Sequence, residues 1–544
     1  MKLKKMRVQN FRSLKDVEIS FQDDLTILIG ENDSGKSSVL DVLELVLSAV
    51  DATRPQPAPD SDFHVDSSTG KPADRIEVEL TFAELEAERS ATPSCQFRAV
   101  FDKGQPPIFQ DTNGNNIDVR TLRSRGLPFM ERYRARDYQR PEDIAIKTLR
   151  NAYGDSLELP NIKDRIDTLR RDIQNILQSH LADLRRLVSQ YVPRTQNLRF
   201  DPILDFTKAL TDGQFMLDRG HGAHPVSGVG DGTKRRFLMA VLEWDRNVRR
   251  RRRETRPLIL AYDEPDTNLD FAAQRTFFKL LDSLAADRRD IQIILCTHSV
   301  LMIDSAPINS LVLLSLNQGI TNVISPFPNT DLMDKELVMF LENMSTRTGL
   351  TNSALLFERC YFLVEGETEH TCLPILYRRK YSRSMRQDGI VPICLSGCGN
   401  TVGLWRFFSQ DWKKDKVITL LDADAADSYG SQRVGQLFII GQKEFEDAFP
   451  DDVWSYVLNA ISEWRPGDGS YWHAGHISAI RQLCMRESRK FSSELITEVQ
   501  KVSRCKPVSK PRLGEALGKN VRLEDIPEPI VQAFEAARKI AGVT

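Results

Sequence analysis

An eight-residue stretch near the N-terminus constrains the fold more than any other part of the sequence. It occupies residues 30–37, reads GENDSGKS and matches the pattern GxxxxGK[ST]. An apolar run at residues 25–29 precedes it, and a segment with an apolar face follows from Ser37 to about Val50. This order predicts a buried strand, a tight glycine loop and a helix whose first amides point into the loop. Loops of this kind bind phosphate groups, so we expect an α/β nucleotide-binding domain.

The individual residues of this loop suit a nucleoside triphosphate with a magnesium ion. Backbone amides surround the phosphate oxygens in such loops, and Lys36 is placed to reach the β- and γ-phosphates. The Ser37 hydroxyl is the expected Mg²⁺ ligand. The candidate nucleotide-binding residues of the loop are Asn32, Ser34, Gly35, Lys36, Ser37 and Ser38.

A second apolar strand supplies the acids that ATP hydrolysis requires. Residues 258–262 are apolar and lead directly into Asp263 and Glu264. We expect Asp263 to bind Mg²⁺ through its hydration shell and Glu264 to polarise the attacking water. The next apolar run, residues 291–296, ends close to His298, which we expect beside the γ-phosphate. The two strand ends predict an ATPase site that uses ATP and Mg²⁺.

A separate set of acids follows two apolar strands in the C-terminal part of the chain. Its members are Glu365 and Glu369 after residues 361–364, and Asp422 and Asp424 after residues 417–421. Residues two apart on a strand point to the same side, so the two aspartates can share a cation with Glu365. Carboxylate oxygens favour Mg²⁺, or Mn²⁺ as the alternative, over zinc. The sequence therefore predicts a divalent-metal site separate from the nucleotide site.

The bulk composition narrows the class of protein further. The 544 residues are too many for one hydrophobic core, so two or more domains are expected. The net charge is −2, from 74 basic and 76 acidic residues, so any nucleic-acid contact depends on local basic patches. No run approaches the roughly 18–20 apolar residues of a membrane span, and the basic N-terminus lacks an apolar signal core. The eight cysteines form no CxxC pair, which favours a reducing cytoplasm.

The order of the N-terminal motifs resembles the ABC-type ATPase heads of RecF, SMC and OLD proteins. The motifs are the phosphate loop, Asp263-Glu264, Asn268-Leu269-Asp270 and His298. Residues 8–14 (VQNFRSL) resemble the first hairpin of those proteins, and residues 227–234 (SGVGDGTK) stand where their signature loop stands. In these families the signature loop closes the ATP site of a partner head. The resemblance therefore implies nucleotide contacts from Gly230 and Gly232 and at least a homodimer.

The C-terminal acids resemble the TOPRIM fold found in topoisomerases, primases and OLD nucleases. Its pattern is a glutamate after the first strand and a DxD after a later strand, which Glu365, Asp422 and Asp424 match. The resemblance implies two divalent cations held by these acids, with Glu365 as a general base or metal ligand. Two such cations lower the pKa of an attacking water and stabilise the leaving oxygen of a phosphodiester.

Further positions follow from the same resemblance. It implies metal ligation by Glu369 and Glu446, although Glu446 also suits a charged helix face. The catalytic basic residue of such nucleases corresponds to Lys510, with Lys506 as its rival. Residues 397–400 (GCGN) resemble the glycine-bearing loop between the two acid motifs, and a plain turn is the alternative.

The expected fold class is α/β: an ABC-type, RecF/SMC-like ATPase head with a helical insert, followed by a TOPRIM domain. Between residues 142 and 212 apolar residues lie three and four apart among charged ones, which is typical of helices. In OLD proteins an insert at this place mediates dimerisation. The predicted domains are the ATPase N-terminal part at 1–141, the dimerisation insert at 142–212, the ATPase C-terminal part at 213–345 and the TOPRIM nuclease at 355–544.

Two basic segments are candidates for contacts with a nucleic-acid backbone. Residues 249–253 are five consecutive arginines, and residues 377–386 are rich in Arg and Lys after the first acid motif. A solvated loop is the favoured interpretation of residues 249–253. Residues 377–386 are better placed to guide a DNA backbone toward the metals, with a solvated surface as the equal alternative.

The whole pattern is most similar to an OLD-family, ATP-regulated and metal-dependent DNA endonuclease. Members of the Gabija and retron-associated types act in anti-phage defence, which implies a helicase or a reverse transcriptase with its msDNA as partner. The alternative is a RecF/SMC-like DNA-binding repair ATPase whose TOPRIM domain does not cleave. Primase or topoisomerase chemistry is disfavoured, because the sequence has no zinc module or recognisable tyrosine domain.

Overall fold

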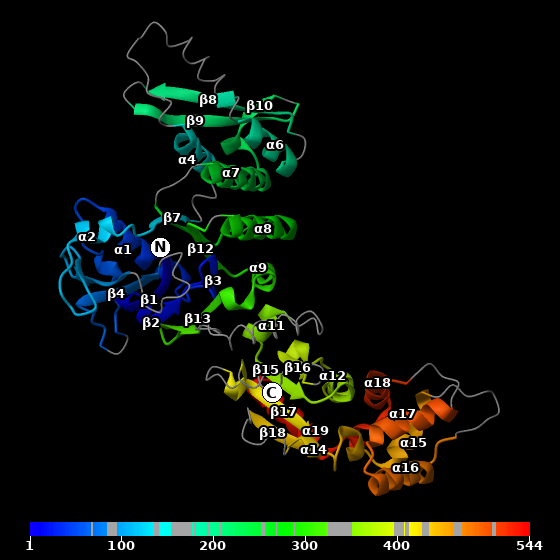
Figure 1. Cartoon of the computed structure of the whole chain (residues 1–544). Helices are drawn as coiled ribbons and strands as arrows, with labels where there is room; N and C mark the ends of the chain where they lie inside the picture. Colours follow the sequence, from blue (N-terminus) through cyan, green and yellow to red (C-terminus); the bar gives the residue numbers. More distant parts are fainter. Residues whose placement is uncertain are drawn as a thin grey trace. The chain divides into compact units, whose positions relative to one another are not determined.

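The computed structural model separates the chain into two compact units, Met1–Pro328 and Asn329–Thr544, called here the N-terminal and the C-terminal unit (Figure 1). It describes residues 1–66, 69–83, 95–134, 141–153, 177–178, 181–192, 195–205, 208–220, 222–251, 256–267, 269–287, 289–324, 351–395, 407–408, 413–426, 435–461, 471–502 and 508–543.

A six-stranded sheet forms the centre of the N-terminal unit. Its spatial order is β14-β13-β3-β12-β11-β7. The strands are β3 (Leu25–Gly30), β7 (Phe129–Tyr133), β11 (Leu258–Asp263), β12 (Ile291–Thr297), β13 (Leu311–Asn317) and β14 (Ile320–Ile324). All neighbours are parallel except β14, which returns antiparallel to β13. Every residue of β3, β11 and β12 is buried, as expected for parallel strands covered on both faces.

One face of this sheet packs on helix α1 (Lys36–Asp51), and a second sheet covers the other side of that helix. The second sheet is antiparallel, in the order β2-β1-β4-β5-β6. Its strands are β1 (Lys2–Phe11), β2 (Leu14–Ser20), β4 (Arg75–Ala83), β5 (Cys95–Asp102) and β6 (Ile108–Gln110), with the short helix α2 (Val119–Ser124) after them. Apolar side chains of both sheets and of α1 form one buried cluster, which fixes α1 at the end of β3.

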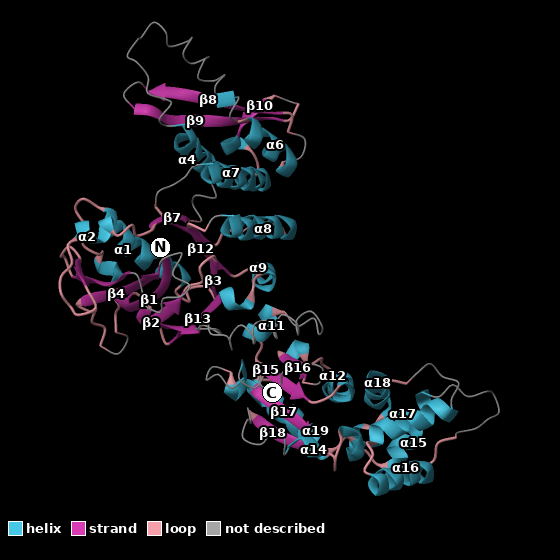
Figure 2. Ribbon diagram, viewed as in Figure 1, coloured by secondary structure: helices cyan, strands magenta, loops and turns pink. Residues whose placement is uncertain are grey.

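Helices α8 (Phe271–Asp287) and α9 (Val300–Ser305) belong to the other face of the parallel sheet (Figure 2). Tyr262 of β11 meets Phe277 of α8 edge to face, with ring centroids 5.6 Å apart. This pairing buries two large rings and holds α8 against the strand that ends in Asp263.

The inserted segment contains helices and a strand hairpin. Helices α4 (Pro141–Tyr153) and α6 (Ala182–Tyr191) both pack on α7 (Asp231–Arg251). Strands β8 (Asn197–Asp205), β9 (Lys208–Asp218) and β10 (Ala223–Pro225) form an antiparallel sheet. The prediction of a helical insert up to residue 212 is therefore wrong for its last part. Apolar residues alternate with polar ones there, and this period of two favours a strand.

A four-stranded parallel sheet in the order β16-β15-β17-β18 forms the centre of the C-terminal unit. Its strands are β15 (Cys360–Val364), β16 (Ile390–Cys394), β17 (Val417–Asp422) and β18 (Gln436–Ile440). The helices are α11 (Asn352–Phe357), α12 (Glu367–Tyr381), α14 (Ala423–Ala426), α15 (Asp451–Ile461), α16 (Ala474–Glu487), α17 (Phe491–Val502), α18 (Lys510–Asn520) and α19 (Glu528–Ile540). One apolar cluster joins this sheet to α12, α19 and the helices between them.

Helices α12 and α18 lie side by side at unusually close range (Figure 1). A Cβ atom added at Gly514 would lie 2.3 Å from the carbonyl oxygen of Thr368, and one at Gly518 would lie 2.8 Å from the Cβ of Ile375. Only glycine fits the first position, because the obstacle is backbone. The first residue of α18, Lys510, is thereby brought to the N-terminal end of α12.

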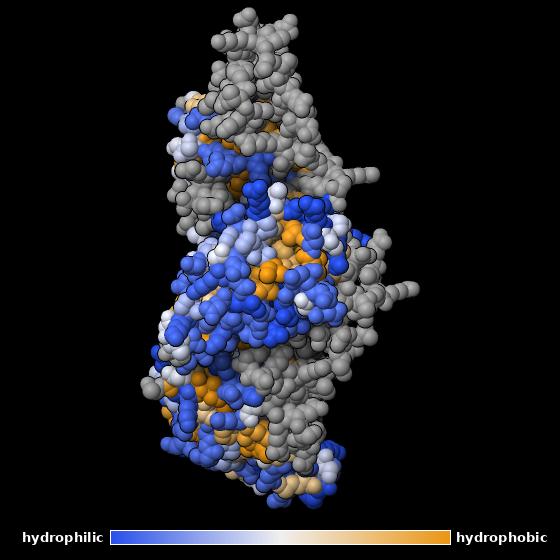
Figure 3. All heavy atoms as spheres, turned by 90° about the vertical axis from the view of Figure 1, so that its left-hand side faces the viewer, coloured by the Kyte–Doolittle hydropathy of each residue, from blue (hydrophilic) through white to orange (hydrophobic). Residues whose placement is uncertain are grey.

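Among the described residues on the face in Figure 3, hydrophilic side chains predominate, with apolar areas between them. Within the described part of the chain, no helix combines the length and the apolar character that crossing a membrane would require.

We expect Gly514→Ala to destabilise the C-terminal unit by about 1–3 kcal/mol, because the added methyl group must push α18 away from α12. Chemical denaturation of the full chain measures this loss. Gly475→Ala in α16 is the matched control, because open space surrounds Gly475. It should be neutral or stabilise by up to about 1 kcal/mol. Equal effects of the two substitutions would contradict the close helix contact.

Candidate nucleotide and metal sites

The phosphate loop lies between β3 and α1, where the sequence predicted it. Gly30 has φ 151°, and a Cβ there would lie 2.1 Å from the carbonyl oxygen of Leu314. A side chain is therefore excluded at this position. Asn32 is exposed and Ser38 half-buried, whereas Ser34 and Gly35 are buried. The Ser34 Oγ atom has no hydrogen-bond partner among the described residues.

Lys36 lies over the loop that precedes it. Its ammonium group donates hydrogen bonds to the carbonyl oxygens of Gly30 at 3.0 Å and Glu31 at 2.8 Å. The residue is only 4% exposed. The positive charge is thus held at the mouth of the loop, where phosphate oxygens would replace the carbonyl groups as acceptors.

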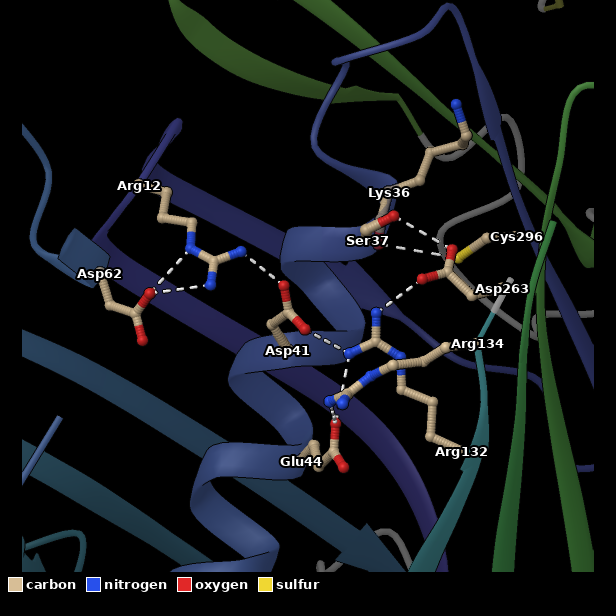
Figure 4. Close-up of polar contacts among 10 residues, drawn as sticks. All are labelled: Arg12, Lys36, Ser37, Asp41, Glu44, Asp62, Arg132, Arg134, Asp263 and Cys296. Carbon is tan, nitrogen blue, oxygen red and sulfur yellow. Dashed lines mark hydrogen bonds and ion pairs between the residues drawn. The ribbon is translucent and has the colours of Figure 1, made fainter. Parts of the chain in front are cut away.

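Ser37 and Asp263 meet across the sheet, as the sequence predicted. The Ser37 hydroxyl donates to Asp263 Oδ1 at 3.0 Å (Figure 4). The other oxygen of Asp263 accepts from Arg132 at 2.6 Å. Arg132 lies on β7 next to β11, and nothing in its local sequence pattern pointed to this site. Burial lowers the pKa of Arg132, but the hydrogen bonds that it donates to Asp263 and Asp41 raise the pKa by more, so the guanidinium is cationic.

Glu264 and His298 also come together, because β11 and β12 are adjacent and parallel. His298 Nδ1 lies 3.8 Å from Glu264 Oε1, and His298 Nε2 lies 4.0 Å from Asp266 Oδ2. Asp266 is fixed by a 2.7 Å hydrogen bond from Thr297. Glu264 has φ 51°, an uncommon backbone conformation for a non-glycine residue that is often found at functional sites.

The glycines of the expected signature loop lie at the start of α7. Gly230 immediately precedes this helix and its carbonyl oxygen accepts from the Thr233 amide at 2.9 Å, while Gly232 lies in the first turn. Asn268, next to Leu269 and Asp270, lies outside the described residues.

Three carboxylates of the C-terminal unit converge at the carboxyl ends of two adjacent strands. Glu365 follows β15, Asp422 ends β17 and Asp424 lies in α14. One carboxylate oxygen from each lies within 4.8 Å of the others, which suits a shared metal ion. The expectation that both aspartates share a strand face is wrong, because β17 ends at Asp422 and the turn into α14 directs Asp424 to the site.

Negative charge at this cluster is strongly opposed by burial. Burial, followed by repulsion from Glu369 and Glu365, raises the pKa of Asp422 to about 9. The Asp422 Oδ1 atom is buried and has no hydrogen-bond partner among the described residues. Burial also raises the pKa of Glu365. A hard divalent cation fits this set, because it would supply both the missing partner and the missing positive charge.

Glu369 and Glu446 form a second, deeper part of the cluster. Burial and repulsion from Glu446 raise the pKa of Glu369 to about 7. The pKa of Glu446 is also raised by burial, although the Thr368 hydroxyl donates to Glu446 Oε1 at 2.8 Å. Glu446 is buried and therefore does not belong to a charged exposed helix face, the alternative left open by the sequence.

Two lysines approach the acids. Lys510 begins α18, and its charge lowers the pKa of Glu365, Glu369 and Glu446 against the larger effect of burial. Lys490, which the sequence analysis missed, has its Nζ 3.8 Å from Asp424 Oδ2. It precedes α17 and is separated from Asp424 by more than sixty residues, so no local pattern connects the two. Lys506 and residues 397–400 lie outside the described residues.

The two basic segments have different outcomes. Two basic side chains of residues 377–386 contact other parts of the C-terminal unit. Arg379 donates hydrogen bonds to the carbonyl oxygens of Gly518 and Val521. Arg383 forms an ion pair with the buried Asp388. These contacts favour a structural role for that part. Of residues 249–253, the last two lie outside the described residues.

Two protein-family models match parts of the chain. A family model described as an AAA ATPase domain matches residues 1–104 and 135–303, together half of the chain. A second, described as the TOPRIM domain of overcoming lysogenization defect protein-like proteins, matches residues 356–424. The expected α/β class and the order of an ATPase domain followed by a TOPRIM domain are confirmed. A search of curated proteins finds no match to the chain.

Solved structures with partial similarity include three SMC head domains. One is an SMC head bound to the C-winged helix domain of ScpA, with 18% identity, a TM-score of 0.42 and coverage of 60% of this chain and 98% of that chain. The head from Thermotoga maritima has 18% identity, a TM-score of 0.35 and coverage of 60% and 99%. The head with an extended coiled coil, bound to ScpA derived from Pyrococcus furiosus, has 15% identity, a TM-score of 0.39 and coverage of 63% and 99%.

We expect Asp422→Asn to raise the melting temperature of the metal-free protein at neutral pH. The native environment raises the pKa of Asp422 from its ordinary value to about 9, so the carboxyl must take up a proton on folding, and the amide avoids this cost. Excess Mg²⁺ or Mn²⁺ should stabilise the wild type by about 2–3 kcal/mol at a hundredfold excess over its Kd. The same ions should stabilise the variant much less. Calorimetric scans of both proteins in EDTA and in metal measure this, and an equal metal effect in both would contradict a metal site at Asp422.

Proposed function

The chain belongs to the AAA ATPase domain family and carries a TOPRIM domain similar to that of overcoming lysogenization defect protein-like proteins, and we propose that it is an ATP-regulated, divalent-metal-dependent DNA endonuclease of the OLD type. The observation that carries the nuclease proposal is the convergence of Glu365, Asp422 and Asp424, with one Asp422 oxygen buried and unpaired among the described residues. Hard carboxylate ligands at a strand edge suit Mg²⁺, with Mn²⁺ as a substitute.

At the nucleotide site we assign each role to a residue of this chain. Lys36 and the amides of the phosphate loop hold the phosphates of ATP, while Ser37 and Asp263 hold Mg²⁺. Glu264 orients and polarises the attacking water. His298, which lies 3.8 Å from Glu264, is assigned the position beside the γ-phosphate. Asn32, Ser34, Gly35 and Ser38 complete the loop around the phosphates.

At the metal site Glu365, Asp422 and Asp424 are the proposed ligands, with Glu369 and Glu446 behind them. When bound, divalent cations activate water and neutralise charge on a phosphodiester. Glu365, which is half-buried, would accept the proton of the attacking water or bind the second cation. Lys510 and Lys490 contribute positive charge beside the acids, which attracts the phosphate backbone of DNA.

The dimer and the biological setting are further parts of the proposal. Gly230 and Gly232 at the start of α7 are proposed to close the nucleotide site of a second copy, because exposed amides at a helix N-terminus bind phosphate. The resulting homodimer or larger homo-oligomer, with the 142–212 insert as a contact, would couple ATP to nuclease access. An anti-phage role with a helicase or reverse transcriptase partner is consistent with this architecture.

The alternative is a RecF/SMC-like repair ATPase whose TOPRIM domain binds DNA without cleaving it. Supercoiled plasmid incubated with the protein and Mg²⁺ or Mn²⁺, with and without ATP, separates the two functions. We expect nicked or linear DNA from the wild type and at least about a hundredfold less from Asp422→Ala, because the metal site loses a ligand. Lys36→Ala should retain the metal-dependent cleavage chemistry and lose its response to ATP. No cleavage under any of these conditions would favour the repair ATPase.

Replacing Glu264 with Gln tests the ATPase assignment. The amide keeps the shape of the side chain but cannot polarise water, so we expect ATP turnover to fall by about 10²-fold or more while ATP binding persists. Filter binding of radiolabelled ATP and phosphate release measure the two steps. Turnover at the wild-type rate would remove Glu264 from its proposed role.

A further inference from the structure

Arg132 is the centre of an ion-pair chain behind the phosphate loop (Figure 4). Its guanidinium lies 2.6 Å from Asp263 Oδ2 and 3.3 Å from Glu44 Oε2, and it also pairs with Asp41. The side chain is 4% exposed. Asp263 ends β11, whereas Asp41 and Glu44 lie on α1, the helix that begins at the end of the phosphate loop.

Asp41 ties this centre to the first hairpin of the chain. It also pairs with Arg12 at 2.5 Å, and Arg12 pairs with Asp62 at 2.8 Å. Arg12 lies in the turn between β1 and β2. Asp41, which Arg12 holds in place, therefore binds the Arg132 guanidinium on the side away from Asp263.

We infer that Arg132 is an internal counter-ion of Asp263: it supplies, in the metal-free state, the positive charge that Mg²⁺ supplies when Mg·ATP is bound. This inference deepens the proposed nucleotide site and rests on it. Both oxygens of Asp263 are engaged, one by Ser37 and one by Arg132. The carboxylate is thus held in one orientation before any cation arrives.

The charge of Arg132 has opposite consequences for the two forms of the nucleotide. ATP without metal brings phosphate charge toward Asp263, and Arg132 screens that repulsion. Mg·ATP brings a cation, which Arg132 repels and Asp263 attracts. In a site shielded from water these effects are large enough to measure. Arg132 is accordingly a positioning residue that sets how strongly ATP binding depends on metal.

Arg132→Gln tests this role by calorimetric titration of ATP into the full chain, in EDTA and in Mg²⁺. We expect the Kd of metal-free ATP to rise by about tenfold, because Asp263 is left uncompensated. The Kd of Mg·ATP should stay the same or fall. A merely structural role would weaken both forms equally, and that result would overturn the inference.

A second substitution keeps the test decisive if the single variant folds poorly. Arg132→Gln combined with Asp263→Asn removes both charges from the pair, so most of the metal-free ATP affinity should return. If the double variant binds metal-free ATP as weakly as the single one, Arg132 does not act through Asp263.

Arg134→Gln is the matched control. Arg134 follows β7, pairs with Glu44 at 2.5 Å and makes no ion pair with Asp263 among the described contacts. It should leave both affinities unchanged. A wild-type protein that binds neither form of ATP would instead refute the proposed function, a result distinct from failure of the Arg132 inference.

Discussion

Buried carboxylates at the carboxyl ends of parallel strands need a positive partner, and both candidate sites depend on how that need is met. At the nucleotide site the chain supplies its own cation, Arg132, directly on Asp263. At the metal site Lys490 and Lys510 lie beside the acids, and one Asp422 oxygen has no hydrogen-bond partner among the described residues. The first site is therefore organised before a ligand binds, whereas the second is organised for a ligand of higher charge.

Strand register in the parallel sheets places most of these acids. β15 and β17 are neighbours with Val364 paired to Leu420, so the residues that follow, Glu365 and Asp422, leave the sheet at the same edge. β11 and β12 bring Glu264 and His298 together in the same way. Helix packing then adds the basic groups, since the glycines of α18 allow the close contact that carries Lys510 toward the acids. The rigid elements thus define the geometry of each site.

Expectations failed for two different reasons. The end of the 142–212 insert forms a β hairpin of β8 and β9, and there the local alternation of apolar and polar residues already favours a strand. Elsewhere the local pattern was not sufficient, because other contacts decide. Asp424 reaches the cluster from a short helix, since β17 ends at Asp422. Arg132 and Lys490 were missed because each meets its acid across a long sequence separation, for which a single sequence carries no periodic signal.

The sequence by itself determined the phosphate loop, the strand that ends in Asp263, the strand that leads to His298 and the order of acids in the TOPRIM domain. Each of these is a short pattern in which one strand, one turn and the residues after it are covalently linked, so local chemistry is sufficient. Only the tertiary structure decided which charges meet. Sheet order, strand register and helix contact distance are set by packing of the whole core, and they placed Arg132 on Asp263 and Lys490 beside Asp424.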